Sequence, residues 1–262
     1  SILANHFDSK SALVFGSGYV ANLGFLSSIL QRGDVVFYDQ YIHASSRDGI
    51  RLSLADSVSF RHNNLKDLSN KLSKKRSQSN YVLVESLYSM DGDLAPLNEI
   101  ASICDKYNAY LIVDEAHAGG VYGEMGKGLC FENKILSKVF ARIITFGKAY
   151  GFHGAAVLGS EILKEYLINF SRSFIYSTAL PPSDYSTISE LVHHKELNEL
   201  RTDLQDNISF FRTLCARKSF LSDPTSPIQI LEFEKPQELE DIVSSLRKHS
   251  IYTKGIYPPT VP

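Results

Sequence analysis

The strongest constraint on the fold comes from apolar runs that are too continuous for half-exposed strands. Residues 81–85 read YVLVE and Ala109–Asp114 reads AYLIVD, and neither run alternates apolar with polar residues. Strands of this kind are buried on both faces, which is typical of parallel sheets covered by helices. Five more short runs have strand character: 12–15, 35–38, 58–60, 142–145 and 155–158.

Helical patterns separate several of these runs, over residues 19–30, 65–75, 97–107 and 161–170. Alternation of strands and helices at this spacing favours right-handed crossovers. The sequence therefore predicts an α/β fold with a mainly parallel seven-stranded sheet and helices on both faces.

The pattern changes after Pro181 and Pro182. We predict a long polar helix over 183–215, a strand over 228–233, a helix over 236–249 and a strand over 251–254. This divides the chain into a large domain, 1–186, and part of a smaller C-terminal α+β domain, 187–262. Because a strand begins about ten residues after Ser1 and no closing element precedes Pro262, we expect an N-terminal arm and further C-terminal chain.

Composition excludes several classes of function. The formal net charge of −2 provides no broad basic surface for nucleic acid. No apolar run reaches the roughly 18 residues of a membrane span, and the opening SILANHFDSK lacks the apolar core of a secretory signal. The three cysteines lie far apart, without the spacing of a disulfide framework or a metal site. We expect a cytoplasmic protein with no nucleic-acid, membrane or metal partner.

A glycine-rich turn connects the first predicted strand to the helix after it. Residues 16–21 read GSGYVA, and Asp39 ends the next strand about 20 residues on, as in a dinucleotide-binding fingerprint. Glycines let the backbone approach a phosphate, and a helix N-terminus offers free N–H groups. We predict a phosphate-binding turn. An NAD-dependent oxidoreductase and a tight turn without a ligand are the alternatives.

Two further groups are expected at strand ends. Asp114 begins the segment DEAH, but the chain has no G-x-x-x-x-G-K-[ST] loop that a nucleotide-hydrolysing helicase would need. Lys148 follows another strand in TFGKAYG, where partial burial would lower its pKa and make the amine nucleophilic. A phosphate anchor, a carboxylate and a lysine at one sheet edge are what pyridoxal 5′-phosphate requires. We therefore predict this cofactor.

Six ordered segments between residue 11 and Pro262 resemble the α-oxoamine synthases: SGYVAN, DQYIHASSRDGIRLS, ESLYSMDGDLAPL, VDEAHAGGVYGEMGKG, TFGKAYGFHGAAVLGS and RSFIYSTALPP. The resemblance implies a fold-type-I pyridoxal-phosphate acyltransferase that condenses an amino acid with an acyl thioester and releases carbon dioxide. These segments and the terminal PPTVP are most similar to family members that use L-alanine and a pimeloyl thioester of coenzyme A or acyl carrier protein in biotin synthesis. A sister synthase such as glycine C-acetyltransferase is the alternative.

The resemblance also implies roles for individual residues. Lys148 would form the imine with the cofactor and act as the base at the substrate α-carbon, and Asp114 would pair with the pyridine nitrogen. His117 would hydrogen-bond the phenolic oxygen, and His43 would stack on the ring close to the substrate. The other implied contacts are Gly18, Tyr19 and Thr145 at the phosphate, Ser89 at the cofactor, Thr260 at the substrate, and Ser177 and Thr178 across a homodimer with shared sites.

Overall fold

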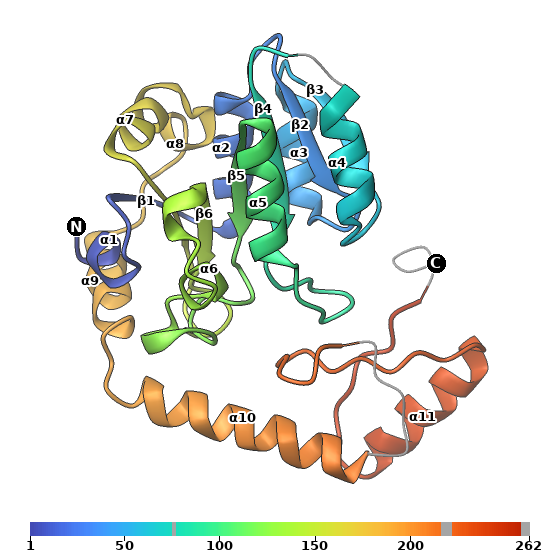
Figure 1. The fold of residues 1–262 in the computed structure, drawn as a ribbon. Helices are drawn as coiled ribbons and strands as arrows, with labels where there is room; N and C mark the ends of the chain where they lie inside the picture. The colour runs from blue at the N-terminus through green and yellow to red at the C-terminus, as the bar shows by residue number, and fades with distance from the viewer. Residues whose placement is uncertain (75–76, 216–221, 258–262) are drawn as a thin grey trace.

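A seven-stranded sheet lies at the centre of the computed structural model, which describes residues 1–74, 77–215 and 222–257 (Figure 1). The strand order is β1-β7-β6-β5-β4-β2-β3. Neighbours from β3 to β6 pair in parallel, whereas β7 is antiparallel to both β6 and β1, so the predicted mainly parallel sheet is confirmed. The strands are β1 (Ser11–Phe15), β2 (Val35–Asp39), β3 (Asp56–Phe60), β4 (Asn80–Glu85), β5 (Ala109–Asp114), β6 (Val139–Thr145) and β7 (Ala155–Gly159).

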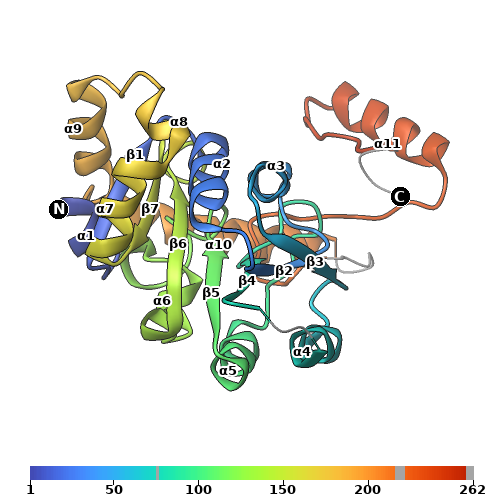
Figure 2. The ribbon, with the colours of Figure 1, turned by 90° about the horizontal axis from the view of Figure 1, so that it is seen from above.

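Helices cover both faces of the sheet, as the view from above shows (Figure 2). One face packs against α4 (Leu65–Lys74), α5 (Leu97–Tyr107) and α6 (Leu129–Glu132). The opposite face packs against α2 (Gly18–Ile29), α3 (Ala44–Leu52) and α7 (Glu161–Phe170). Because β4 and β5 are buried between these two layers, their side chains are apolar on both sides, as the uninterrupted runs predicted.

We predict no helix over α3 from the sequence, and the reason lies in its packing against α2. The buried residues of α3 are Ser45, Ser46, Gly49 and Ile50, of which only one is a large apolar residue. A Cβ on Gly49 would lie 2.9 Å from the backbone oxygen of Asn22, so glycine permits a close approach of the two helices. This approach brings the start of α3 next to the start of α2.

The C-terminal region differs from the prediction in two ways. The single helix expected over 183–215 is two helices, α9 (Pro182–Leu191) and α10 (Leu197–Leu214), because the chain turns between them and Val192 stays in the core beside Ile188. Within the described residues, 228–233 and 251–254 form no strands, since no neighbouring strand there pairs with them. The helix expected over 236–249 is present as α11 (Pro236–Lys248). The division at residue 186 stays a prediction.

The remaining short helices are α1 (Ile2–His6), α8 (Arg172–Ile175) and the 3₁₀ turns η1 (Glu124–Gly126) and η2 (Leu136–Lys138). Among the helices of the described chain, none combines the length and apolar character needed to cross a bilayer.

His62 connects the end of β2 to the loop between β4 and α5. Its Nδ1 lies 3.0 Å from Asp39 Oδ1 and its Nε2 lies 2.8 Å from Asp93 Oδ2. Burial alone would lower the pKa of His62, but the hydrogen bonds and charges of the two carboxylates outweigh it and raise the pKa to about 10. His62 is therefore a cation at neutral pH that holds two segments together.

We expect His62→Gln to destabilise the fold in a pH-dependent way. Folding raises the pKa of His62 from 6.5 to about 10. The stabilisation by His62 is therefore fully present below pH 6.5 and is lost as the pH rises through about 10. The free energy of unfolding should fall by roughly 3 kcal/mol at pH 6 and by less at pH 10. Urea titrations at both pH values measure this, with the exposed His194→Gln as control; an equal loss at both would contradict it.

Candidate active site

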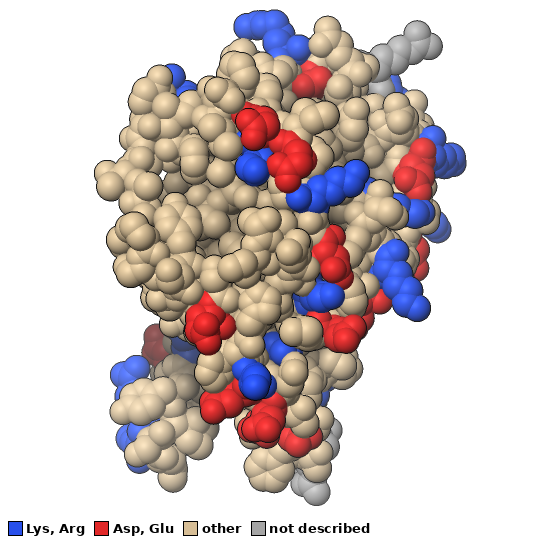
Figure 3. Space-filling model, turned by 90° about the vertical axis from the view of Figure 1, so that its left-hand side faces the viewer, with Lys and Arg blue, Asp and Glu red and all other residues tan. Residues whose placement is uncertain are grey.

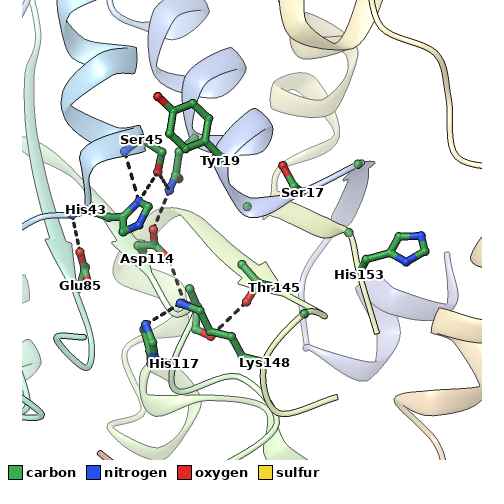
Figure 4. Close-up of a pocket in the computed structure, with 16 residues that line it drawn as sticks. Ser17, Tyr19, His43, Ser45, Glu85, Asp114, His117, Thr145, Lys148 and His153 are labelled. Atoms are coloured by element: carbon green, nitrogen blue, oxygen red, sulfur yellow. Dashed lines mark hydrogen bonds between the residues drawn. The ribbon is translucent and has the colours of Figure 1, made fainter. Parts of the chain in front are cut away.

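A cavity of about 270 Å³ opens where the carboxyl ends of β4, β5 and β6 meet the start of α2 (Figure 4). The parallel register explains the convergence, because Glu85 pairs with Asp114 and Asp114 pairs with Ile143, two residues before Thr145. Most of the predicted site residues line this cavity: Gly18, Tyr19, His43, Asp114, His117, Thr145 and Lys148.

The other predicted site residues do not line the cavity. Ser89 lies in the loop between β4 and α5, outside the lining. Ser177 and Thr178 are exposed after α8 and also lie outside it. Thr260 falls outside the described residues. The roles implied for these four residues therefore stay predictions.

Asp114 is buried at the end of β5 and its carboxylate is held from two sides. Asn22 Nδ2 donates to Oδ2 at 2.8 Å, and the backbone N–H of Ala116 donates to Oδ1 at 3.0 Å. The amide of Asn22 also donates to Ser45 Oγ at 3.1 Å, which joins α2 to α3. Donors that bind the charged form favour it, so the site keeps an oriented carboxylate in a buried position.

His43 stands at the N-terminus of α3 and presents its ring to the same space as Asp114 (Figure 4). Its Nδ1 accepts from the backbone N–H of Ser45 at 3.2 Å and lies 2.7 Å from Ser45 Oγ. Its own backbone N–H donates to Glu85 Oε1 at 2.5 Å. The start of α3 thus fixes the ring through Ser45, and the end of β4 holds the backbone of His43.

Lys148 lies in the loop between β6 and β7 and hydrogen-bonds through Nζ to His117 Nε2. Burial, and then the charge of Lys148, lowers the pKa of His117 to about 3, so this imidazole is neutral and Nε2 accepts. Lys148 is exposed at the mouth, yet burial of its ammonium lowers its pKa despite the opposing charges of Asp114 and Glu85. The result is an amine that loses its proton more readily than a surface lysine.

The start of α2 forms the opposite wall of the cavity. Ser17 Oγ accepts from Val20 N–H at 3.2 Å, and the first N–H groups of the helix have no partners within it. Nothing lies within 4 Å of a Cβ built on Gly16, whereas a Cβ on Gly18 would lie 2.6 Å from Thr145 Cγ2. The turn is therefore an open cradle of N–H groups suited to an anion.

Sequence reasoning missed several residues that the structure places at the cavity, among them Asn22, Ser45 and Glu85. Asn22 is a polar residue within an apolar helix, which is a signal that could have been used. Glu85 ends a buried strand beside Asp114, but only the strand register reveals that proximity. Thr145 also differs from the implied phosphate contact, since its hydroxyl donates to the backbone oxygen of Ala116 at 3.1 Å.

The structure overturns the dinucleotide interpretation of Asp39. Four strands separate β1 from β2, so the glycine-rich turn and Asp39 are not on neighbouring strands. The carboxylate of Asp39 is fully buried and bonds to His62, the backbone N–H of Tyr41 and that of Asn63. It does not line the cavity and has no free face for a ribose.

The family model for aminotransferases of class I and II matches residues 3–262. The chain belongs to this family. Among its relatives is the 8-amino-7-oxononanoate synthase of Serratia proteamaculans, which is 39% identical over 99% of this chain and 68% of that protein. The chain spans about two thirds of the length of the curated relatives it matches.

Solved aminotransferase-family structures share the fold. A serine palmitoyltransferase from Sphingomonas wittichii superposes with a TM-score of 0.95 at 29% identity, over 100% of this chain and 67% of that one. An 8-amino-7-oxononanoate synthase from Francisella tularensis superposes with a TM-score of 0.85 at 33% identity, over 98% of this chain and 76% of that one. Two enzymes with different names therefore share this architecture, and the fold alone does not decide between them.

We expect Gly18→Ala to weaken the binding of pyridoxal phosphate. The new Cβ must displace Thr145 Cγ2, and overpacking of this kind costs on the order of 1–3 kcal/mol, which corresponds to roughly 5- to 150-fold in affinity. Titration calorimetry measures the change. Ser27→Ala, in the same helix and away from the cavity, controls for helix propensity, and equal affinities of the two variants would refute the expectation.

Proposed function

We propose that the chain is an α-oxoamine synthase that condenses L-alanine with a pimeloyl thioester, releases carbon dioxide and forms 8-amino-7-oxononanoate, a step of biotin synthesis. The observation that carries the proposal is the placement of Lys148, Asp114 and His43 around one cavity that begins at the N-terminus of α2. The identity of 39% to a protein of that name supports the choice of substrates.

The residues of the cavity fit pyridoxal phosphate. The turn has open space at Gly16, and the N–H groups of Gly18 and Tyr19 in the first turn of α2 would hold the phosphate. Asp114 offers an oriented carboxylate to a protonated ring nitrogen. Lys148 provides an amine of lowered pKa for a carbonyl carbon. When bound, the cofactor supplies an electron sink that stabilises negative charge at the α-carbon of the amino acid.

The chain's own groups then divide the remaining work. Lys148 Nζ removes the proton from the substrate α-carbon, and neutral His117 orients Nζ through Nε2. The carboxylate of Asp114 would hold a proton on the ring nitrogen of the bound cofactor. His43 lines one side of the cavity, where its ring would stack on the cofactor.

Lys148→Ala should abolish both thiol release and covalent attachment of the cofactor, because no other cavity residue supplies an amine. Borohydride reduction followed by mass spectrometry detects the attachment. Lys195→Ala, at an exposed lysine between α9 and α10, is the matched control. Attachment that survives Lys148→Ala would refute the scheme.

Asp114→Asn should lower kcat/KM by roughly 10²–10³-fold, which is the scale for loss of one preorganised electrostatic group.

The alternative is a sister synthase, such as glycine C-acetyltransferase or serine palmitoyltransferase. The fold, which a serine palmitoyltransferase shares at a TM-score of 0.95, does not separate this alternative from the proposed function. Thiol release should be measured with alanine, glycine and serine against pimeloyl, acetyl, succinyl and palmitoyl thioesters, on coenzyme A and on acyl carrier protein. We expect the largest kcat/KM for alanine with a pimeloyl thioester. A preference for serine with a palmitoyl thioester would identify the alternative instead.

We also propose a homodimer in the cytoplasm. On the side of the molecule that carries α1, α7 and α9, an area without charged side chains lies on the left of the view, whereas charged side chains spread over its middle and right (Figure 3). Large apolar side chains are exposed on α7 and just after α8, with Ile162 82% and Tyr176 75% accessible. A second copy on this face would bury them and bring Ser177 and Thr178 toward its cavity.

The three cysteines are free, which fits a reducing compartment such as the cytoplasm.

A further inference from the structure

Two carboxyl groups lie side by side at the edge of the sheet that forms the cavity. Glu85 ends β4 and Asp114 ends β5, and the two residues are register partners in adjacent parallel strands, whose spacing is about 4.8 Å. Both line the cavity and each is only 4% exposed. Water is therefore a poor shield between them, and simultaneous ionisation is costly.

The donors around the pair are distributed unequally. Asp114 accepts from the side chain of Asn22 and from the backbone N–H of Ala116, so both of its oxygens are used. Glu85 accepts from the backbone N–H of His43 through Oε1, and no bond to its Oε2 occurs within the described residues. The stronger donor set favours the anion at Asp114, and it leaves the Oε2 of Glu85 able to carry a proton.

The charges near Glu85 also favour its protonated form. Lys148 attracts both carboxyls, but its single positive charge balances only one of them. Burial first, and then the charge of Asp114, raises the pKa of Glu85 to about 8. The titratable groups that act on Glu85 are Asp39 on β2, His43 before α3, Tyr88 after β4, Asp114 on β5 and Lys148 after β6.

We propose that Glu85 is a positioning residue that keeps its proton at neutral pH, so that Asp114 alone carries the negative charge of the cavity while Glu85 Oε1 holds His43 in place. This inference deepens the proposed function and rests on it only for the identity of the substrates. A neutral carboxyl remains an acceptor for the His43 N–H. It also adds no second negative charge beside the amine of Lys148.

Infrared spectroscopy of the full chain loaded with pyridoxal phosphate tests the proton on Glu85 directly. At pH 7 the wild type should show a carboxylic-acid C=O band that E85Q lacks, and the band should disappear with a midpoint near pH 8. In D114N the neighbouring charge is removed, so the band should disappear at a lower pH. Absence at pH 7 of a band assigned to residue 85, or an unchanged midpoint in D114N, overturns the proposal.

The positioning of His43 has a separate readout. The visible circular dichroism of bound pyridoxal phosphate reports the asymmetry that surrounding groups impose on its ring. E85Q keeps an acceptor for the His43 N–H and should retain the wild-type signal at pH 7, whereas E85L should lose most of it. Equal signals in E85Q and E85L would overturn the positioning role. If E85L does not fold, loss of the signal in E85Q decides against it.

These results are independent of the substrate assays. A protonated Glu85 in a protein that does not condense alanine with a pimeloyl thioester would remove the proposed function and leave this inference standing. Condensation of alanine with a pimeloyl thioester by a protein without the infrared band would support the proposed function and overturn this inference.

Discussion

Asp114 places a carboxylate at the end of a strand that is covered on both faces, where an unpaired charge would cost several kcal/mol. Two donors from different elements hold this charge: Asn22 from α2 and the backbone N–H of Ala116. Asn22 also reaches Ser45 in α3, and Gly49 lets α3 approach α2 closely. The same two helices begin at the anion cradle and at His43. The stabilisation of one carboxylate therefore sets the relative positions of three walls of the cavity.

The residue that follows Asp114 performs a structural task on the opposite side of the chain. Glu115 is fully buried and accepts from Arg142 Nη1 at 3.1 Å and from the Cys130 N–H at 2.9 Å. Arg142 also donates to the carbonyl groups of Phe7 and Lys127. Both oxygens of Glu115 and both Nη atoms of Arg142 are hydrogen-bonded, which is the condition under which a buried pair is tolerated. The strand end is thus anchored in the core while Asp114 faces the cavity.

The sequence predicted best where burial alone decides the pattern. Residues 81–85 and Ala109–Asp114 are continuous apolar runs, and the ends of these strands with Lys148 indicated the site before the structure did. The helix α3 is not predicted from the sequence because its contact with α2 depends on serine and glycine rather than on apolar residues. The dinucleotide alternative that rested on Asp39 is wrong because only the topology shows which strands are neighbours. Glu85 was missed for the related reason that only the register places it beside Asp114.

Burial shifts the pKa values of the acids and of the bases of the cavity in opposite directions. It raises the pKa of Glu85 to about 8, lowers that of His117 to about 3 and lowers that of Lys148. Each shift favours the uncharged form of its group. Asp114 is held by two donors, Asn22 Nδ2 and the backbone N–H of Ala116. A lysine of lowered pKa beside an oriented carboxylate and an uncharged imidazole can serve both as a nucleophile and as a base.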